Sequence, residues 1–471
     1  TAIDAPRLRR LLAEAAARAA ALGRPVLASL TQAVEAREPV GLFSAARQCG
    51  LQAFLWARPD ADFSLVGADV CQTLESSGAD RFAALRSAWR ALLADALIDN
   101  PQAAPATGPV LGGGFSFDPE QAAAEQWRDY ADASLVLPRL QLSSTAQGSY
   151  LTVNALVAPG QDTPLLARQL REQWRAILEA CAAPAAAGAA PKLDFHDLPT
   201  EARWKDMVRE AATAIGAGAM QKVVLAREVR ANASAPLQLR QALERLRALY
   251  PSAYLFAVTR GARCFFGATP ERLVRLDGGR VEVTALAGTC RRGISPDEDR
   301  LLGAMLLGSP KDRHEHALVV DALRATLDGL CLDLRVPAAP TLLQLKNVQH
   351  LYTPISGRLR GAACVLDLVA ALHPTPAVGG LPRAAALEHL RRHEQLQRGW
   401  FAAPLGWIDA AGDGEFAVAL RCALAGEREA ALFAGCGIVA DSDPDNEFAE
   451  TVLKLRAMRY ALGQEERRAA R

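Results

Sequence analysis

The chain has 471 residues, of which 50% are hydrophobic and 22% are charged, and this composition excludes a disordered or fibrous polymer. Its 53 Lys and Arg residues against 52 Asp and Glu residues leave a formal net charge of +1, so no electrostatic footprint predicts binding to nucleic acid. An acidic ligand must therefore be held by a few placed cations.

Three features of the sequence bear on where the protein works. No stretch approaches the roughly 18 uninterrupted apolar residues that predict a membrane span. Residues 1–23 mix Asp4 and Glu14 with arginines, which indicates an amphipathic helix and not a secretory signal. The nine cysteines are widely spaced, and no pair has Cys-x-x-Cys spacing. We therefore expect a cytoplasmic protein without disulfide bonds, structural zinc or membrane contact.

Hydrophobic periodicity predicts both helices and strands in the first 190 residues. The predicted helices cover 5–22, 83–98 and 165–180, and strands are predicted at 134–137 and 150–153. Residues 112–115, three glycines before a phenylalanine, are interpreted as a tight turn between strands, because no nucleotide-binding fingerprint follows them.

A stretch of small residues, 181–191, separates this part from the rest of the chain and is interpreted as a connector. Strands are predicted after it at 222–229, 253–258, 264–267, 273–276, 416–421 and 431–434. Helices are predicted at 201–217, 298–307, 312–328, 365–372, 383–392 and 447–462. This mixture favours an α/β (α+β) fold with large, mostly antiparallel sheets.

Two of the predicted helices carry carboxylates at a spacing that suits a divalent cation. Glu447 and Glu450 are three residues apart, and Asp312 and Glu315 have the same spacing. Each pair shares one helical face, and Mg²⁺ binds a few protein carboxylates together with waters and substrate oxygens. From spacing alone, two solvated helix faces with intrahelical ion pairs are the alternative.

Three further side chains are candidates for acid–base chemistry or carboxylate binding. Lys222 lies in an apolar strand, where burial would lower its pKa and leave a neutral amine to act as a base. Glu271 follows a proline turn and could be a protonated general acid, and Arg421 could pair with a carboxylate. The alternatives are a strand-end lysine in water, a turn carboxylate and a structural salt bridge.

The glycines around Cys436 indicate ligand binding and not a nucleophile. This segment lacks the Gly-x-Cys-x-Gly spacing and an arranged histidine base, so Cys436 is interpreted as a packed residue. Gly435 and Gly437 have no side chains, so their backbone N–H groups could approach a ligand closely.

Seven short motifs occur in an order that is typical of one enzyme family. They are Lys222-Val-Val-Leu-Ala-Arg227, Gly267-Ala-Thr-Pro-Glu-Arg-Leu273, Ala285-Leu-Ala-Gly-Thr289, Lys311-Asp-Arg-His-Glu-His316, Leu372-His-Pro-Thr-Pro-Ala377, Phe433-Ala-Gly-Cys-Gly-Ile-Val439 and Glu447-Phe-Ala-Glu-Thr-Val-Leu-Lys454. Together they resemble the chorismate-utilising enzymes, and specifically the isochorismate synthases. The resemblance runs from near Met207 to near Met458, and residues 1–190 resemble the family loosely, chiefly through 112–118.

The resemblance implies one large fold of two mainly antiparallel sheets with outer helices. Residues 1–190 would form its N-terminal part and residues 191–471 its catalytic region, within one integrated domain. It implies an Mg²⁺-dependent isomerase that converts chorismate to isochorismate for siderophore, salicylate or menaquinone synthesis. We expect a monomer whose partner is this small-molecule substrate, with no nucleic acid, membrane or glutaminase subunit.

The resemblance also implies the chemical roles of individual residues. Lys222 would deprotonate the water that attacks C2 of the ring, and Glu271 would protonate the C4 hydroxyl as it leaves. Glu315 and Glu450 would hold Mg²⁺, with further contributions through waters from a second pair of carboxylates, Asp312 and Glu447.

Substrate-binding roles follow from the same motifs. Gly288 and Thr289 would bind the ring carboxylate, and His350 would lie near the reacting ring. Ala377 would lie near the enolpyruvyl group. The groups that would hold the enolpyruvyl carboxylate are Arg421, Lys454, Gly435 and Gly437.

Two alanines bear on which reaction is expected. Ala287 stands where relatives that make aminodeoxychorismate commonly have a lysine, and Ala377 where relatives that continue to salicylate tend to have a threonine. Both favour stopping at isochorismate. The alternatives are a salicylate synthase, an anthranilate synthase component and a non-catalytic chorismate-binding subunit. Residues 74–76 resemble the tryptophan-binding segment of anthranilate synthases only weakly, and all acid, base and metal-ligand positions are present.

Overall fold

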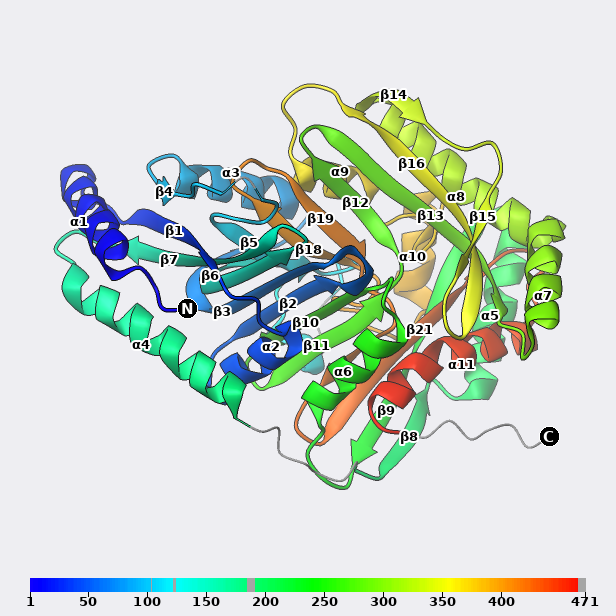
Figure 1. The fold of residues 1–471 in the computed structure, drawn as a ribbon. Coiled ribbons are helices and arrows are strands. Elements are labelled where there is room, and N and C mark those ends of the chain that lie inside the picture. The colour runs from blue at the N-terminus through cyan, green and yellow to red at the C-terminus, as the bar shows by residue number, and fades with distance from the viewer. Residues whose placement is uncertain (103, 122–123, 184–190, 465–471) are drawn as a thin grey trace.

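A computed structural model describes residues 1–102, 104–121, 124–183 and 191–464 of the chain. They form two large β-sheets with helices on their outer faces (Figure 1). Most of the predicted connector, residues 184–190, lies outside the described residues. No helix in the described part of the chain is long and apolar enough to cross a membrane.

The first sheet combines strands from both halves of the sequence. In spatial order its strands are β4 (Leu97–Asp99), β1 (Val26–Val34), β7 (Gly148–Val157), β6 (Ala133–Thr145), β3 (Phe63–Ser76), β2 (Ala53–Arg58), β10 (Tyr254–Arg260), β11 (Arg263–Thr269), β20 (Cys422–Ala425), β21 (Glu429–Ile438) and β9 (Lys222–Ala233). Two short strands, β8 (Leu193–Leu198) and β17 (Gly380–Leu381), pair with different parts of β9. Among the described strands, only β1 and β4 pair in parallel.

The second sheet branches from the first along β3 and β6. The first half of β6 pairs with β5 and its second half with β7, so the long strands belong to both sheets. From β6 the order continues through β5 (Val110–Phe115), β18 (Pro404–Asp409), β19 (Gly414–Val418), β12 (Arg272–Asp277), β13 (Arg280–Arg291) and β16 (Val348–Leu359), and β16 also pairs with β14 (Cys331–Arg335) and β15 (Thr341–Gln344).

The glycine run at 112–114 is a buried strand, so the prediction of a tight turn is wrong. It forms the middle of β5, between β6 and β18. A Cβ atom at Gly112 would lie 2.7 Å from the Phe54 ring, and one at Gly114 would lie 2.7 Å from the Trp400 ring. The glycines therefore admit two aromatic rings from the core, which no hydrophobic periodicity can reveal because glycine has no side chain.

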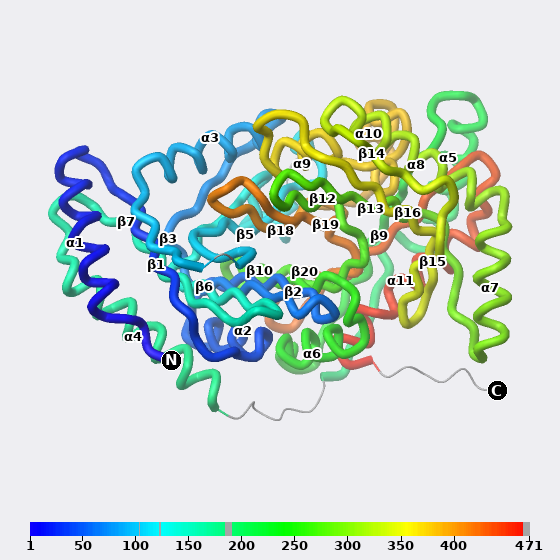
Figure 2. The backbone as a smooth tube through the Cα atoms, turned by 45° about the horizontal axis from the view of Figure 1, so that its top comes forward, coloured from blue at the N-terminus to red at the C-terminus, as the bar shows by residue number. Residues whose placement is uncertain are grey.

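Helices cover the outer faces of both sheets and close the two ends of the molecule. Against the first sheet lie α1 (Ala5–Leu22), α2 (Pro39–Gln48), α4 (Thr163–Ala182), α6 (Leu239–Leu249) and α11 (Pro444–Ala461). The others are α3 (Arg81–Leu93), α5 (Glu201–Gly216), α7 (Pro296–Gly308), α8 (Pro310–Asp328), α9 (Val365–Leu372) and α10 (Arg383–His393). Helices α1 and α4 lie at one end and α7 at the other (Figure 1, Figure 2).

Most predicted helices are confirmed to within three residues at each end. The helix predicted at 83–98 is the main exception, because α3 ends at Leu93 and 97–99 form strand β4 on the edge of the first sheet. Helices α2 and α6 are not predicted from the sequence. One large core cluster joins strands of both sheets with helices that include α3, α5, α8 and α9, and its largest fully buried rings include Trp56, Trp127, Trp204 and Trp400.

Candidate active site

A pocket of about 800 Å³ lies where β9 and β21 of the first sheet meet β13 and β16 of the second. Eleven of the fourteen predicted site residues line it: Glu271, Gly288, Thr289, Glu315, His350, Ala377, Arg421, Gly435, Gly437, Glu450 and Lys454. The other three lie directly behind this lining. Lys222 contacts Glu315, Asp312 packs against Gly288, and the backbone carbonyl of Glu447 faces Cys436.

Lys222 and Glu315 form an ion pair beneath the pocket. The Lys222 side chain is fully buried, and its Nζ lies 2.8 Å from Glu315 Oε1. Both side chains occupy the space that a Cβ atom at Gly437 would take, since such an atom would collide with Glu315 Oε1 and lie 2.9 Å from Lys222 Cε. Burial acts to raise the pKa of Glu315, but the charges of the neighbouring lysines outweigh it and the pKa is lowered.

The strand that carries Lys222 presents the face that its alternation predicts. Val224 and Ala226, two and four residues after Lys222, lie on the same face of β9 as Lys222. Both of them line the pocket. The interpretation of Lys222 as a strand-end residue in water is therefore wrong, because the side chain is excluded from solvent.

Glu271 enters the pocket from the short link between β11 and β12. Its side chain is buried, and burial raises its pKa to about 8, although the nearby charges of Lys222 and Lys454 act to lower it. The backbone of this link is held in place by β19, because the Val418 N–H donates to the Glu271 carbonyl at 3.0 Å. Glu271 is therefore a neutral carboxylic acid at pH 7, which is the state that a proton donor requires.

His350 joins a cation to a hydroxyl group across the pocket wall. Arg421 Nη2 donates to His350 Nε2 at 2.8 Å, so the ring proton lies on Nδ1, which donates to Thr289 Oγ1 at 3.0 Å. Burial, followed by the charges of Arg421 and Lys454, holds the pKa of His350 well below its usual range. The Thr289 hydroxyl accepts from this neutral ring and keeps its own hydrogen for a group in the pocket.

The strand predicted at 416–421 is too long, and Arg421 does not end a regular strand. Strand β19 ends at Val418, and Arg421 has a φ of +46°, in the left-handed region that costs a non-glycine residue about 1–3 kcal/mol. Its carbonyl accepts from the Ala268 N–H at 3.1 Å, which holds the bend in place. Burial lowers the pKa of the guanidinium to about 10, so Arg421 stays charged at neutral pH.

The two acidic helices meet at this pocket, and their carboxylates face lysines. Glu450 Oε1 lies 2.7 Å from Lys454 Nζ, and Glu447 Oε1 lies 3.2 Å from Lys311 Nζ. Burial, and then the charge of Glu450, raises the pKa of Glu447. Among the described residues, no group of three or more His, Cys, Asp or Glu side chains is gathered as a ready-made metal cluster.

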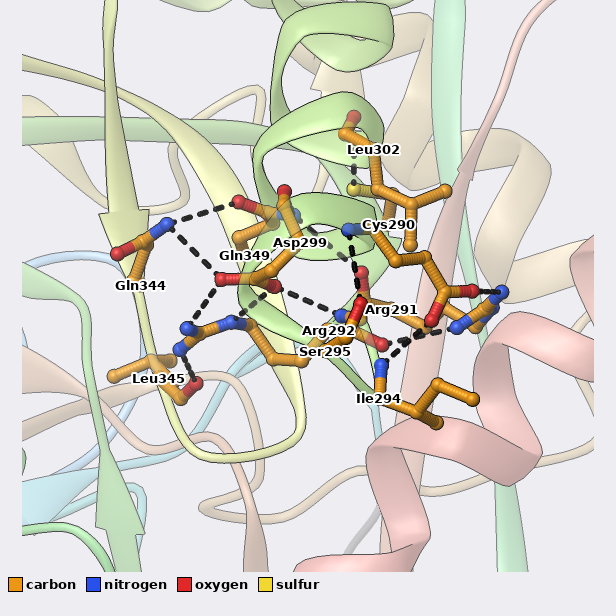
Figure 3. A network of polar contacts seen from close by, with 12 residues as sticks. Cys290, Arg291, Arg292, Ile294, Ser295, Asp299, Leu302, Gln344, Leu345 and Gln349 are labelled. Carbon is orange, nitrogen blue, oxygen red and sulfur yellow. Dashed lines mark hydrogen bonds and ion pairs between the residues drawn. The ribbon is translucent and has the colours of Figure 1, made fainter.

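The segment between the predicted ring-carboxylate and metal residues is fixed by a polar network (Figure 3). The chain leaves the pocket after Thr289, forms α7 and returns to α8, which begins at Pro310. Arg292 donates to both carboxylate oxygens of Asp299, at 2.7 and 2.5 Å, and to the Leu345 carbonyl at 2.6 Å. Arg292 thereby joins the first turn of α7 to the turn between β15 and β16.

No sequence pattern predicts Arg398 as a pocket residue. Its side chain is buried, it lines the pocket, and it pairs with Glu394. The two residues are four apart, but they follow α10 and do not lie on a helix, so the i,i+4 spacing of the pair is not a helical signal.

A family model described as "Chorismate binding enzyme" matches residues 12–463 of the chain. The protein belongs to the chorismate-binding enzyme family. This confirms the family that the seven motifs predict, and the mainly antiparallel fold that the resemblance implies is confirmed with it.

Members of this chorismate-binding family resemble the chain over nearly its whole length. The "Salicylate biosynthesis isochorismate synthase" of Pseudomonas aeruginosa is 41% identical over 97% of this chain and 94% of its own. The "Isochorismate synthase MenF" of Bacillus subtilis is 37% identical over 94% of both chains. The structure of MenF, the menaquinone-specific isochorismate synthase of Escherichia coli, has 26% identity and a TM-score of 0.77, and covers 96% of this chain and 99% of that one.

Proposed function

We propose that this protein is an isochorismate synthase, an isomerase that converts chorismate to isochorismate. The observation that carries the proposal is the pairing of opposite proton-transfer groups at one pocket: a buried lysine, Lys222, and a buried neutral acid, Glu271. Two relatives named as isochorismate synthases, which match nearly all of the chain, support the same reaction.

In the proposed reaction, the neutral amine of Lys222 takes a proton from the water that attacks C2 of the ring, and the ion pair with Glu315 is the state after this transfer. Glu271 gives its proton to the C4 hydroxyl, which leaves as water while the ring double bonds shift. One water is consumed and one is released, so the product is an isomer of the substrate. Glu315, 2.8 Å from Lys222, stabilises the ammonium that forms when Lys222 accepts the proton.

The two substrate carboxylates would be bound by different parts of the wall. Arg421 and Lys454 supply positive charge for the enolpyruvyl carboxylate, and the Thr289 hydroxyl donates to the ring carboxylate. Beyond Leu432, strand β21 has no described strand partner on the side opposite β9, because β20 pairs only with 430–432. The Gly435 carbonyl accepts from Lys454 Nζ at 2.8 Å, and the backbone N–H groups of Gly435 and Gly437 would be available to a ligand.

We also propose that one Mg²⁺ binds at Glu315 and Glu450, with Asp312 and Glu447 contributing through waters. Both proposed ligands line the pocket. Burial, and then repulsion by Glu450, raises the pKa of Glu447, and a cation would relieve the repulsion. Mg²⁺ commonly binds through one or two carboxylates plus waters and substrate oxygens, so a cluster of three protein ligands is not required. When bound, it supplies positive charge for the ring carboxylate.

Removal of divalent cations is therefore expected to abolish turnover, and added Mg²⁺ is expected to restore it. Glu450→Gln should reduce kcat by about 10²–10³-fold, the scale of a lost electrostatic group. The measurement is the initial rate of chorismate consumption at increasing Mg²⁺, for wild type and variant. Asp297→Asn, an exposed carboxylate on α7, is the matched control and should leave the Mg²⁺ dependence unchanged. Full turnover in excess EDTA contradicts the proposed metal site.

The product distinguishes the proposed activity from the other reactions of chorismate. Ala287 and Ala377 both line the pocket, so neither a lysine nor a hydroxyl reaches the substrate from these positions. Incubation with chorismate and Mg²⁺ should give a mixture of chorismate and isochorismate, and the same mixture should form from isochorismate. The two isomers differ only in the position of one hydroxyl and are similar in energy. Chromatography measures both.

Three outcomes of this product assay would contradict the proposal. Stoichiometric salicylate and pyruvate would identify a salicylate synthase, and anthranilate formed on addition of ammonium would identify an amine-using enzyme. No consumption of chorismate by the folded protein with Mg²⁺ would favour a non-catalytic binding subunit.

A further inference from the structure

We propose that the buried ion pair of Glu394 and Arg398 is a positioning device for the reaction, which holds the strand of Lys222 against the neighbouring pocket segment around Val378. This inference rests on the proposed function. Both side chains are only 1% exposed, and Arg398 lines the pocket beside Ala377 and Val378. Neither residue is assigned a chemical role in the proposed reaction.

The pair fills a gap in the hydrogen-bonding edge of β9. On this side, β17 pairs with residues 222 and 223 of β9, the Val224 N–H donates to the Gly379 carbonyl at 3.0 Å, and β8 pairs with residues 228–233. The Val224 carbonyl and the Ala226 N–H therefore have no partner in a described strand. Arg398 Nη2 donates to the Val224 carbonyl at 2.6 Å, and the Ala226 N–H donates to Glu394 Oε2 at 2.9 Å. The two side chains thus take the place of a strand, because buried backbone groups require partners.

The same guanidinium also binds the segment that leads into β17, which lies beside β9. Arg398 Nη1 donates to the Val378 carbonyl at 2.9 Å, and the guanidinium carbon lies 4.2 Å from the centre of the Phe117 ring. Two further hydrogen bonds, at 2.6 and 2.7 Å, join Arg398 to the Glu394 carboxylate and hold its planar group in one orientation. One rigid group therefore fixes both Val224, two residues from Lys222, and Val378, next to Ala377.

This arrangement separates positioning from substrate binding. A small shift of β9 would move the Lys222 amine relative to the reacting ring, and a misplacement of about 1 Å can cost about 10²-fold in rate. Arg421 and Lys454 are proposed to bind a substrate carboxylate. Arg421 follows β19 and Lys454 lies on α11, and neither forms a hydrogen bond or ion pair with Glu394 or Arg398. Loosening the pair should therefore lower kcat and leave the KM for chorismate nearly unchanged.

The test uses the full-length enzyme in two variants. Arg398→Lys keeps the charge but replaces three separated donor nitrogens of one planar group by a single nitrogen, which does not reproduce the contacts to Glu394, Val378 and Val224. We expect kcat per folded enzyme to fall by about 10- to 100-fold. The double variant Glu394→Leu/Arg398→Met replaces the pair by apolar side chains and leaves no unpaired charge buried, although the Val224 and Val378 carbonyls and the Ala226 N–H lose their partners. It should show the same loss of kcat, with KM within about threefold of the wild-type value. Both are assayed well below their melting temperatures.

Arg391→Lys is the matched control, because Arg391 also lies at the end of α10 and binds a buried carboxylate, that of Asp118, away from the pocket. It should keep the wild-type kcat. Wild-type kcat in the double variant or in Arg398→Lys would overturn the proposal, since a purely structural pair changes the melting temperature alone.

Hydrogen exchange in the wild-type protein tests the contact even if the variants fail to fold. The Ala226 amide should be protected although no described strand pairs with β9 on the side that this N–H faces, and rapid exchange there would overturn the proposed role. This measurement does not depend on the reaction. A wild-type protein that makes no isochorismate but protects Ala226 would contradict the proposed function and not the contact.

Discussion

Lys222→Ala is expected to lower kcat by at least about 10²-fold, because general bases contribute about 10²–10⁴-fold. Lys222 is the fully buried lysine whose amine lies within 2.8 Å of Glu315, and an alanine leaves the water at C2 without a proton acceptor. The expected loss is in kcat, since the proposed carboxylate-binding groups are unchanged. Steady-state kinetics at saturating Mg²⁺ measure it.

Two additions make this experiment specific for the missing amine. Small primary amines in the assay should restore part of the activity of Lys222→Ala, because the removed side chain leaves a space beside Glu315 and Gly437. Lys205→Ala, a lysine paired with Glu201 and Asp445 outside the pocket, is the matched control and should keep full activity. Near-wild-type kcat of Lys222→Ala at neutral pH would contradict the assignment of the base.

Glu271→Gln is expected to lower kcat by at least about 10²-fold, because the amide keeps the shape of the side chain and has no proton to transfer. The same residue predicts the pH dependence of the wild-type enzyme. Its pKa is raised to about 8, so the proton donor is lost and kcat for chorismate falls as the pH rises through about 8. A kcat that stays constant up to pH 10 would contradict the role of Glu271 as the acid.

Glu271→Gln should also stabilise the fold, and the sign of the effect follows from the pKa. The carboxyl has a pKa of about 8 in the folded chain and an ordinary value of 4.5, so folding takes up a proton between these pH values. The free energy of unfolding of the wild type therefore falls by up to about 1.4 kcal/mol per pH unit in this range, through this one group. Glutamine does not ionise, so the free energy of unfolding of Glu271→Gln does not fall with rising pH through this group.

Thermal unfolding of both proteins checks this expectation. The variant and the wild type should have similar melting temperatures at pH 4.5, and the variant should melt higher at pH 8. A variant that melts lower than the wild type at pH 8 would show that burial does not disfavour the ionised form of Glu271. A gain in stability with a loss of activity is typical of a residue retained for function.

Much of the architecture follows from local sequence patterns. The 3.6-residue period predicts α1, α5, α8 and α9 closely, because each of these helices buries one apolar stripe. The spacing of Asp312 and Glu315, and of Glu447 and Glu450, predicts two carboxylate-bearing helix faces. The ordered motifs predict the family. Each helix, each pair of carboxylates and each single motif consists of residues that are close in the chain, so one segment contains the information for it.

Other features depend on contacts between segments that are far apart in the chain. Strand β5 is built of glycines because rings from Phe54 and Trp400 occupy the space above them, and the left-handed Arg421 turns out of β19 to reach His350. The segment that contains Glu394 and Arg398 carries no pattern, because its partners are backbone groups of β9 and of residue 378.

Sequence patterns predict which residues could act as acid, base or ligand, and the tertiary structure decides which of them are in a state to do so. Glu271 could be an ordinary turn carboxylate, and only burial by the surrounding strands raises its pKa to about 8. Lys222 could end a strand in water, and only the approach of α8, with Glu315, and of Gly437 on β21 encloses it. The reason is physical: desolvation and charge pairing arise from neighbours in space, and a local pattern describes neighbours in sequence.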